Sequence, residues 1–140
     1  MSAITTYTIV ILCLLAFISC DNKSKTELLF IVPNDYRGPI RVVESANDGI
    51  QPKKEGTPYI LRVPASGEIR IRTLEILESW HRRSAREENG VAIPSAEEIA
   101  PGSVGFHGLG TAVEGETTTS FYFVGTRQEA EQFAKSVHLR

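Results

Sequence analysis

Glu68-Ile-Arg-Ile-Arg72 alternates charged and apolar residues without interruption. Successive side chains of a β-strand point to opposite faces, so this pattern predicts a strand that directs Ile69 and Ile71 into a core and three charged side chains into water. Strands with one solvated face are typical of antiparallel sheets. The stretch therefore indicates an antiparallel sheet that is wet on one side.

Short segments of strand character recur on both sides of this stretch, separated by turns that contain Pro, Gly or Asn-Asp. The expected strands cover residues 28–32, 40–44, 59–63 and 117–124. The first of them is apolar throughout, which is typical of a strand buried on both faces. No helical pattern of useful length lies between these strands. The sequence therefore predicts a mainly β domain, an antiparallel β-sandwich, and argues against a parallel α/β sheet.

Residues 74–94 fit two different structures. Leu74, Leu77 and Trp80 have helical spacing and suit a helix that ends at Asn89-Gly90. The same Asn-Gly pair, between two short segments, also suits a β-hairpin. The hairpin is favoured because the surrounding chain is predicted as strand. Residues 102–115 are rich in glycine, and we expect them to be irregular.

The last segment has the signature of an amphipathic helix. Thr126-Arg-Gln-Glu129 is a capping box, in which the Thr126 hydroxyl accepts from the Glu129 amide and the Glu129 carboxylate accepts from the Thr126 amide. Apolar residues then recur at helical spacing, at Ala130, Phe133, Ala134 and Val137. The sequence therefore predicts one C-terminal α-helix packed on the sheet.

The composition is that of a single globular domain. The chain has 140 residues, of which 41% are hydrophobic and 23% charged. Its net charge of −2 comes from 15 basic and 17 acidic residues spread along the sequence, and no basic cluster exceeds a pair, so we expect no nucleic-acid partner. Both cysteines, Cys13 and Cys20, precede the predicted domain at residues 27–140. That domain therefore has no thiol for a disulfide or a metal site.

Residues 9–18 are apolar without interruption. This length fits the core of a signal helix and falls short of the roughly 20 residues that span a bilayer. The run leads into Phe17-Ile-Ser-Cys20, which resembles the lipobox of bacterial lipoproteins. Phe17 stands where that motif usually has Leu, and residues 1–8 contain no Lys or Arg.

The lipobox resemblance implies that the chain is cleaved before Cys20 and that acyl groups are attached to its thiol. Residues 1–19 are then a lipoprotein signal peptide, residues 20–26 a polar tether, and the membrane a partner through the lipid anchor. The alternatives are an uncleaved anchor, a conventional signal peptide and a buried helix. We expect the domain to sit in the cell envelope, on the periplasmic or extracellular face.

Several short motifs are spread over residues 28–134. They are Phe30-Ile-Val-Pro33, Tyr36-Arg-Gly38, the stretch from Tyr59 to Pro64 with Gly67, and the stretch from Phe121 to Thr126. Together they resemble a family of small bacterial lipoproteins, a domain of unknown function. The first half is also similar to the transthyretin-like (prealbumin-like) modules of bacterial surface proteins. Neither resemblance implies a catalytic residue.

The sequence offers few groups for catalysis or metal binding. His81, His107 and His138 lack the spacing of metal ligands, so we expect no metal and no cofactor. Ser103 and His107 are close in sequence, but Pro101 replaces the first glycine of a nucleophile elbow. No catalytic residue is assigned.

A ligand or partner surface is expected at two places. Trp80, His81, Arg82 and Arg83 combine an aromatic ring with two guanidinium groups, which bind carboxylates, phosphates or sugars. The glycines around His107 allow a ligand to approach the backbone. The leading hypothesis is a non-enzymatic envelope lipoprotein with a binding or structural role and an envelope protein as partner. The alternatives are a small enzyme with its site near His107, and an inhibitor or immunity-like lipoprotein with an exposed apolar patch.

Overall fold

The computed structural model describes residues 26–78 and 81–139. The leader, Cys20, residues 21–25 of the tether and Trp80 lie outside the described residues. The elements in chain order are β1 (Thr26–Val32), β2 (Gly38–Glu44), β3 (Lys53–Lys54), β4 (Pro58–Arg62), β5 (Glu68–Ile71), α2 (Glu75–Glu78), β6 (His81–Glu87), β7 (Ala92–Ile93), β8 (Gly105–Glu114), β9 (Thr117–Gly125) and α3 (Arg127–Ser136). Within these ranges no helix is long and apolar enough to cross a bilayer.

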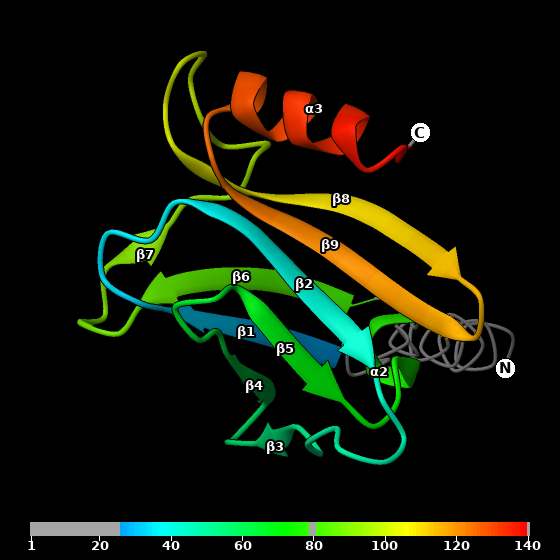
Figure 1. Ribbon diagram of the computed structural model, residues 1–140. Coiled ribbons are helices and arrows are strands. Elements are labelled where there is room, and N and C mark those ends of the chain that lie inside the picture. The colour runs from blue at the N-terminus through cyan, green and yellow to red at the C-terminus, as the bar shows by residue number, and fades with distance from the viewer. Residues whose placement is uncertain (1–25, 79–80, 140) are drawn as a thin grey trace, which may run out of the picture.

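The strands form two sheets that face each other. Sheet A has the order β3-β4-β1-β6-β7, and sheet B has the order β5-β2-β9-β8. Figure 1 shows sheet B between sheet A on one side and helix α3 on the other. The structure is therefore mainly β with two sheets and one C-terminal helix, as the sequence predicts; a transthyretin-like relationship stays a prediction.

The prediction that the sandwich is antiparallel is wrong for three strand pairs. β1 runs parallel to both of its neighbours, β4 and β6, and β2 runs parallel to β5. The reason lies in the connections: β1, β4 and β6 alternate along the chain with β2 and β5 of the other sheet. Each excursion through sheet B returns the chain to sheet A in its original direction, where a tight hairpin would have reversed it.

Apolar side chains of both sheets meet in one core between them. Ile69 and Ile71 point inward as the alternation predicts, with 3% and 0% of their surface exposed. Phe30 is fully buried, and its ring centroid lies 5.1 Å from that of Phe106 and 4.6 Å from that of Tyr122. These three rings join β1 of sheet A to β8 and β9 of sheet B.

The structure of residues 74–94 contains a part of each of the two alternatives. The helix α2 is a single turn, Glu75–Glu78, stabilised by the burial of Leu74 just before it. The favoured hairpin is confirmed for β6 and β7, which pair antiparallel through Ala85 and Ile93. The N–H of Glu87 donates to the carbonyl of Val91 at 2.8 Å and closes the turn between them.

The expectation that residues 102–115 are irregular is wrong from Gly105 onward. β8 pairs with β9 from Gly105 to Glu114, so the ladder of a neighbouring strand overrides the weak strand propensity of glycine. The register shifts between Gly108 and Gly110, a bulge that leaves Leu109 without a paired residue. Glycine thus marks an irregularity within a strand.

Helix α3 covers the outer face of sheet B. Phe133 lies with its ring centroid 6.1 Å from that of Phe121 and 5.7 Å from that of Phe123, and Ala130 is buried at the same interface. The capping box is confirmed: the Glu129 N–H donates to the Thr126 hydroxyl, and the Thr126 N–H donates to the Glu129 carboxylate at 2.7 Å. The hydrogen bonds from Thr126, the backbone one first, hold the pKa of Glu129 below its usual value.

We expect Thr126→Ala to lower the free energy of unfolding by about 1 kcal/mol, because the first turn of α3 loses its cap. Urea unfolding followed by circular dichroism measures the change. Thr126→Ser keeps the hydroxyl and serves as the matched control. A Thr126→Ala protein as stable as the control would show that the cap does not contribute.

Candidate functional site

The two sheets are joined at one edge of the sandwich by the residues that follow β7. The N–H of Phe106 in β8 donates to the carbonyl of Pro94 at 2.9 Å, and the N–H of Ala96 donates to the carbonyl of Phe106 at 3.1 Å. The chain therefore crosses at Pro94 from the edge of sheet A to the edge of sheet B.

An open groove of about 710 Å³ lies beside this crossing, named here the β6–β8 groove. Two walls enclose it, the first residues of β6 on one side and the loop between β7 and β8 on the other. Its lining residues are Arg82, Arg83, Ser84, Ile93, Ser95, Glu97, Glu98 and Phe106. The volume is in the range of small-ligand and peptide sites.

Arg83 extends into this groove from the core side of sheet A. It is in register with the fully buried Leu28 of β1, so its side chain leaves β6 on the inner face of the sheet. Its guanidinium carbon lies 5.8 Å from the ring centroid of Tyr122. A Cβ at Gly108 would collide with the guanidinium, so the absence of a side chain at Gly108 makes room for Arg83.

The groove carries charges of both signs. Burial raises the pKa of Tyr122, and the adjacent Arg83 acts in the opposite direction. The pKa of Glu97 is lowered, first by the hydrogen bond that the Ser95 hydroxyl donates to its carboxylate at 2.9 Å, with smaller contributions from Arg83 and His107. The groove thus presents guanidinium groups on the β6 wall and carboxylates on the loop wall, an arrangement suited to binding by forked hydrogen bonds.

The structure brings together only some of the residues that the sequence singles out. Arg82 and Arg83 line the groove, whereas Trp80 lies outside the described residues and His81 is described only as the first residue of β6. Tyr122 is missed by sequence reasoning because Phe121-Tyr-Phe-Val124 reads as a core strand. Strand alternation, which places Tyr122 on the opposite face from its two Phe neighbours, is the signal that could have found it.

His107 lies on the other side of sheet B, away from the groove. It is in register with Phe123 beneath α3, and only 6% of its surface is exposed. Its Nε2 is 2.9 Å from the carbonyl oxygen of Gly125, to which it donates. Ser103 lies in a turn closed by its own N–H and the Ala100 carbonyl. In the described ranges no hydrogen bond joins Ser103 to His107, as the enzyme alternative would need.

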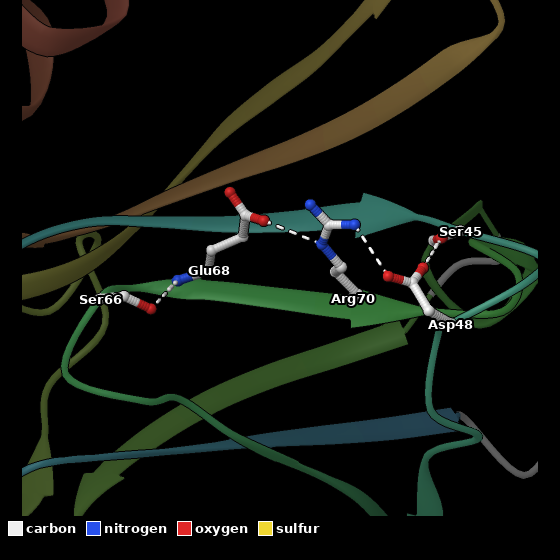
Figure 2. A network of polar contacts seen from close by, with 5 residues as sticks. All are labelled: Ser45, Asp48, Ser66, Glu68 and Arg70. Carbon is white, nitrogen blue, oxygen red and sulfur yellow. Dashed lines mark hydrogen bonds and ion pairs between the residues drawn. The ribbon is translucent and has the colours of Figure 1, made fainter.

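A polar network at the opposite edge of sheet B is satisfied within itself. Arg70 donates to Glu68 at 3.1 Å and to Asp48 at 2.9 Å, and the Ser45 hydroxyl donates to Asp48 (Figure 2). The bond from Ser45, followed by Arg70, holds the pKa of Asp48 below its usual value. This network ties the loop after β2 to β5. Over residues 26–78 and 81–139 no group of three or more His, Cys, Asp or Glu side chains has the arrangement of a metal site.

The exposed large apolar side chains are dispersed. Ile50 lies in the loop after β2, Val91 in the turn between β6 and β7, and Val113 near the end of β8. These three side chains come from separate segments of the described chain. The contiguous apolar patch of the inhibitor-like alternative stays a prediction.

Comparisons with known proteins give one distant likeness in fold. No protein-family model and no curated protein matches the chain. A crystal structure described as a "Putative Lipoprotein from Bacillus anthracis" superposes with a TM-score of 0.46 at 15% identity, covering 79% of this chain and 77% of the other.

Proposed function

We propose that the protein is a membrane-anchored lipoprotein of the cell envelope whose domain is a non-enzymatic binding module. The observation that carries the first part is the position of Cys20. It follows the apolar run at residues 9–18 after Ser19, and the first strand, β1, begins a few residues later, at Thr26. The Cys20 thiol thus stands between a signal-like segment and a domain without cysteine, at the position where the lipobox resemblance implies acylation.

The position of β1 fits this anchor. β1 lies in the middle of sheet A, with β4 on one side and β6 on the other, and its first residue is Thr26. Residues 21–25 span at most about 18 Å when extended. The domain would therefore be held close to the membrane surface, with the Thr26 end of sheet A nearest to the bilayer.

The binding role is supported by the β6–β8 groove. Its charged side chains can recognise a ligand. The Ser95 hydroxyl of the lining donates to the Glu97 carboxylate, and among the described residues no hydrogen bond joins a histidine to this pair. His107, the residue on which an enzyme was expected to depend, donates to a backbone carbonyl beneath α3. We therefore propose recognition as the role of the groove.

Cys20→Ser is expected to abolish lipid attachment, because the thioether to the lipid needs the thiol. The full chain, produced in a bacterium that acylates its own lipoproteins and fed radioactive palmitate, should carry the label, whereas the Cys20→Ser chain should show background only. Cys13→Ser, in the same leader, is the matched control and should be labelled like the unmodified chain. Equal labelling of the Cys20→Ser chain would contradict the proposal.

A further inference from the structure

We propose that the β6–β8 groove receives an extended peptide segment of a partner protein, which adds as a strand to the free edge of β6 and places a carboxylate side chain on Arg83. The inference rests on the proposed binding role and specifies the chemistry of the partner. Strand addition of this kind takes its affinity from backbone hydrogen bonds and its specificity from alternate side chains.

The backbone of Arg83 is directed into the groove. The N–H of Glu87 donates to Val91, so the polar backbone groups of Glu87 face β7. Alternate residues of a strand direct these groups to the same side, which places those of Ala85 and Arg83 on the β7 side as well. β7 reaches only as far as the pair of Ala85 and Ile93. The N–H and C=O of Arg83 are therefore left facing the groove.

The chain itself does not complete this edge. Pro94, which follows β7, has no N–H to donate, and its carbonyl accepts from Phe106 of sheet B. The crossing at Pro94 thus leads the chain away from β6 before it reaches Arg83. Among the described residues β7 does not pair with β6 beyond Ala85, and no turn or loop backbone hydrogen bond involves Arg83.

The other sheet edges have features that discourage pairing. β3 ends sheet A with two exposed residues, Lys53 and Lys54. The edge of β5 is occupied by Ile50, whose N–H donates to the Arg70 carbonyl at 2.9 Å and whose carbonyl accepts from Arg72 at 3.0 Å. β8 is bulged at Leu109. Short, covered and bulged edges resist strand addition. The start of β6 is neither covered nor bulged, and its basic side chains, Arg82 and Arg83, favour an acidic guest strand.

Charge complementarity specifies the side chain of the guest strand. A residue paired with Arg83 would direct its side chain to the same face, where the guanidinium lies over Tyr122. Arg83 makes no salt bridge among the described residues, and its guanidinium lies over the ring of Tyr122. A carboxylate matches the two-pronged donor geometry of a guanidinium. The guest is therefore an extended segment with Asp or Glu opposite Arg83.

The test uses the full chain in detergent micelles and a fluorescent heptapeptide, Lys-Val-Thr-Glu-Thr-Val-Lys, with blocked ends. Anisotropy measures binding, and hydrogen exchange maps protected amides. We expect binding with protection at Arg83. Arg83→Gln in the protein, and Gln in place of the central Glu in the peptide, should each weaken binding about tenfold or more, because a charge-assisted hydrogen bond is lost. Arg62→Gln, at an exposed arginine of β4, is the matched control and should bind normally.

Two further ligands test whether the guest binds as a strand. N-methylation of the central Glu removes the backbone donor and should also abolish tight binding. N-acetylglutamate methylamide, which has the carboxylate without the strand, should bind far more weakly than the heptapeptide. The proposal would be overturned if the heptapeptide did not bind, or if its binding were insensitive to Arg83→Gln or to N-methylation. It would also be overturned if the single-residue ligand bound equally well, or if hydrogen-exchange protection were confined to β8. None of these results affects the palmitate labelling of Cys20, so the anchor is judged separately.

Gly108→Ala provides an independent variant within the same proposal. Its Cβ would occupy the position of the Arg83 guanidinium, the mobile end of a long side chain that can move aside at little cost to folding. We expect the variant to fold with an unchanged unfolding midpoint and to bind the heptapeptide several-fold more weakly. Unchanged binding in a folded Gly108→Ala protein would contradict the placement of the carboxylate on Arg83.

Discussion

Phe30→Ala is expected to lower the free energy of unfolding by about 3–5 kcal/mol, the usual cost of removing a buried aromatic ring. Phe30 is fully buried and packs against Phe106 and Tyr122, with ring centroids 5.1 and 4.6 Å away. Its strand has a hydrogen-bonded neighbour on each side, β4 and β6, so the backbone cannot readily collapse into the space that the ring leaves. Urea unfolding of the full chain in micelles measures the loss.

Two controls separate the cavity from a general effect of substitution. Phe30→Leu keeps most of the apolar volume and should cost clearly less than Phe30→Ala. Val113→Ala removes a side chain that is 67% exposed and should change the free energy of unfolding by less than about 0.5 kcal/mol. If Phe30→Ala were no more harmful than Val113→Ala, the two sheets would not share the core described above.

Gly67→Ala is expected to cost about 2–5 kcal/mol, from two effects that act together. Gly67 has φ +77°, a conformation that L-residues with a side chain adopt only with strain. A Cβ there would also collide with the Tyr36 hydroxyl and the Pro39 carbonyl oxygen, which are joined by a 2.6 Å hydrogen bond. The turn before β5 would have to shift, and with it the bond from the Arg41 N–H to the Gly67 carbonyl, 2.8 Å long.

Gly56→Ala is the matched control, because Gly56 also has a positive φ, +67°, but a Cβ there meets nothing within 4 Å. It should cost only the conformational part, about 1–2 kcal/mol. The difference between the two variants in thermal or urea unfolding isolates the collision at Tyr36 and Pro39. Equal costs would show that the contact of Gly67 with this turn is looser than the structure indicates.

The alternation in Glu68–Arg72 predicts which side chains are buried, and does so correctly, but it does not predict the direction of the neighbouring strand. Alternation of charged and apolar residues indicates that one face of the strand is exposed to solvent. β5 has such a face although it runs parallel to β2. Direction depends on long connections between the sheets. A local signal was present in β1, whose apolar run with Ile31 also buried is typical of a strand with parallel neighbours.

The candidate site is only partly visible in the sequence for a similar reason. Arg82 and Arg83 could be singled out because their chemistry is local. Glu97 and Tyr122 come from distant segments. Glu97 approaches Arg83 from the loop that follows the crossing at Pro94, and Tyr122 approaches it from β9 of the facing sheet. The glycines near His107 suggested a loop open to ligands, whereas β9 pairs with this segment and α3 covers His107.

Attachment of the domain to the membrane by a lipid on Cys20 can be tested by mass spectrometry of the N-terminal peptide of the mature protein, isolated from membranes of the producing bacterium. We expect a chain that begins at Cys20 and carries a diacylglyceryl group on its sulfur. An N-terminus elsewhere, or a Cys20 with a free thiol, would contradict it.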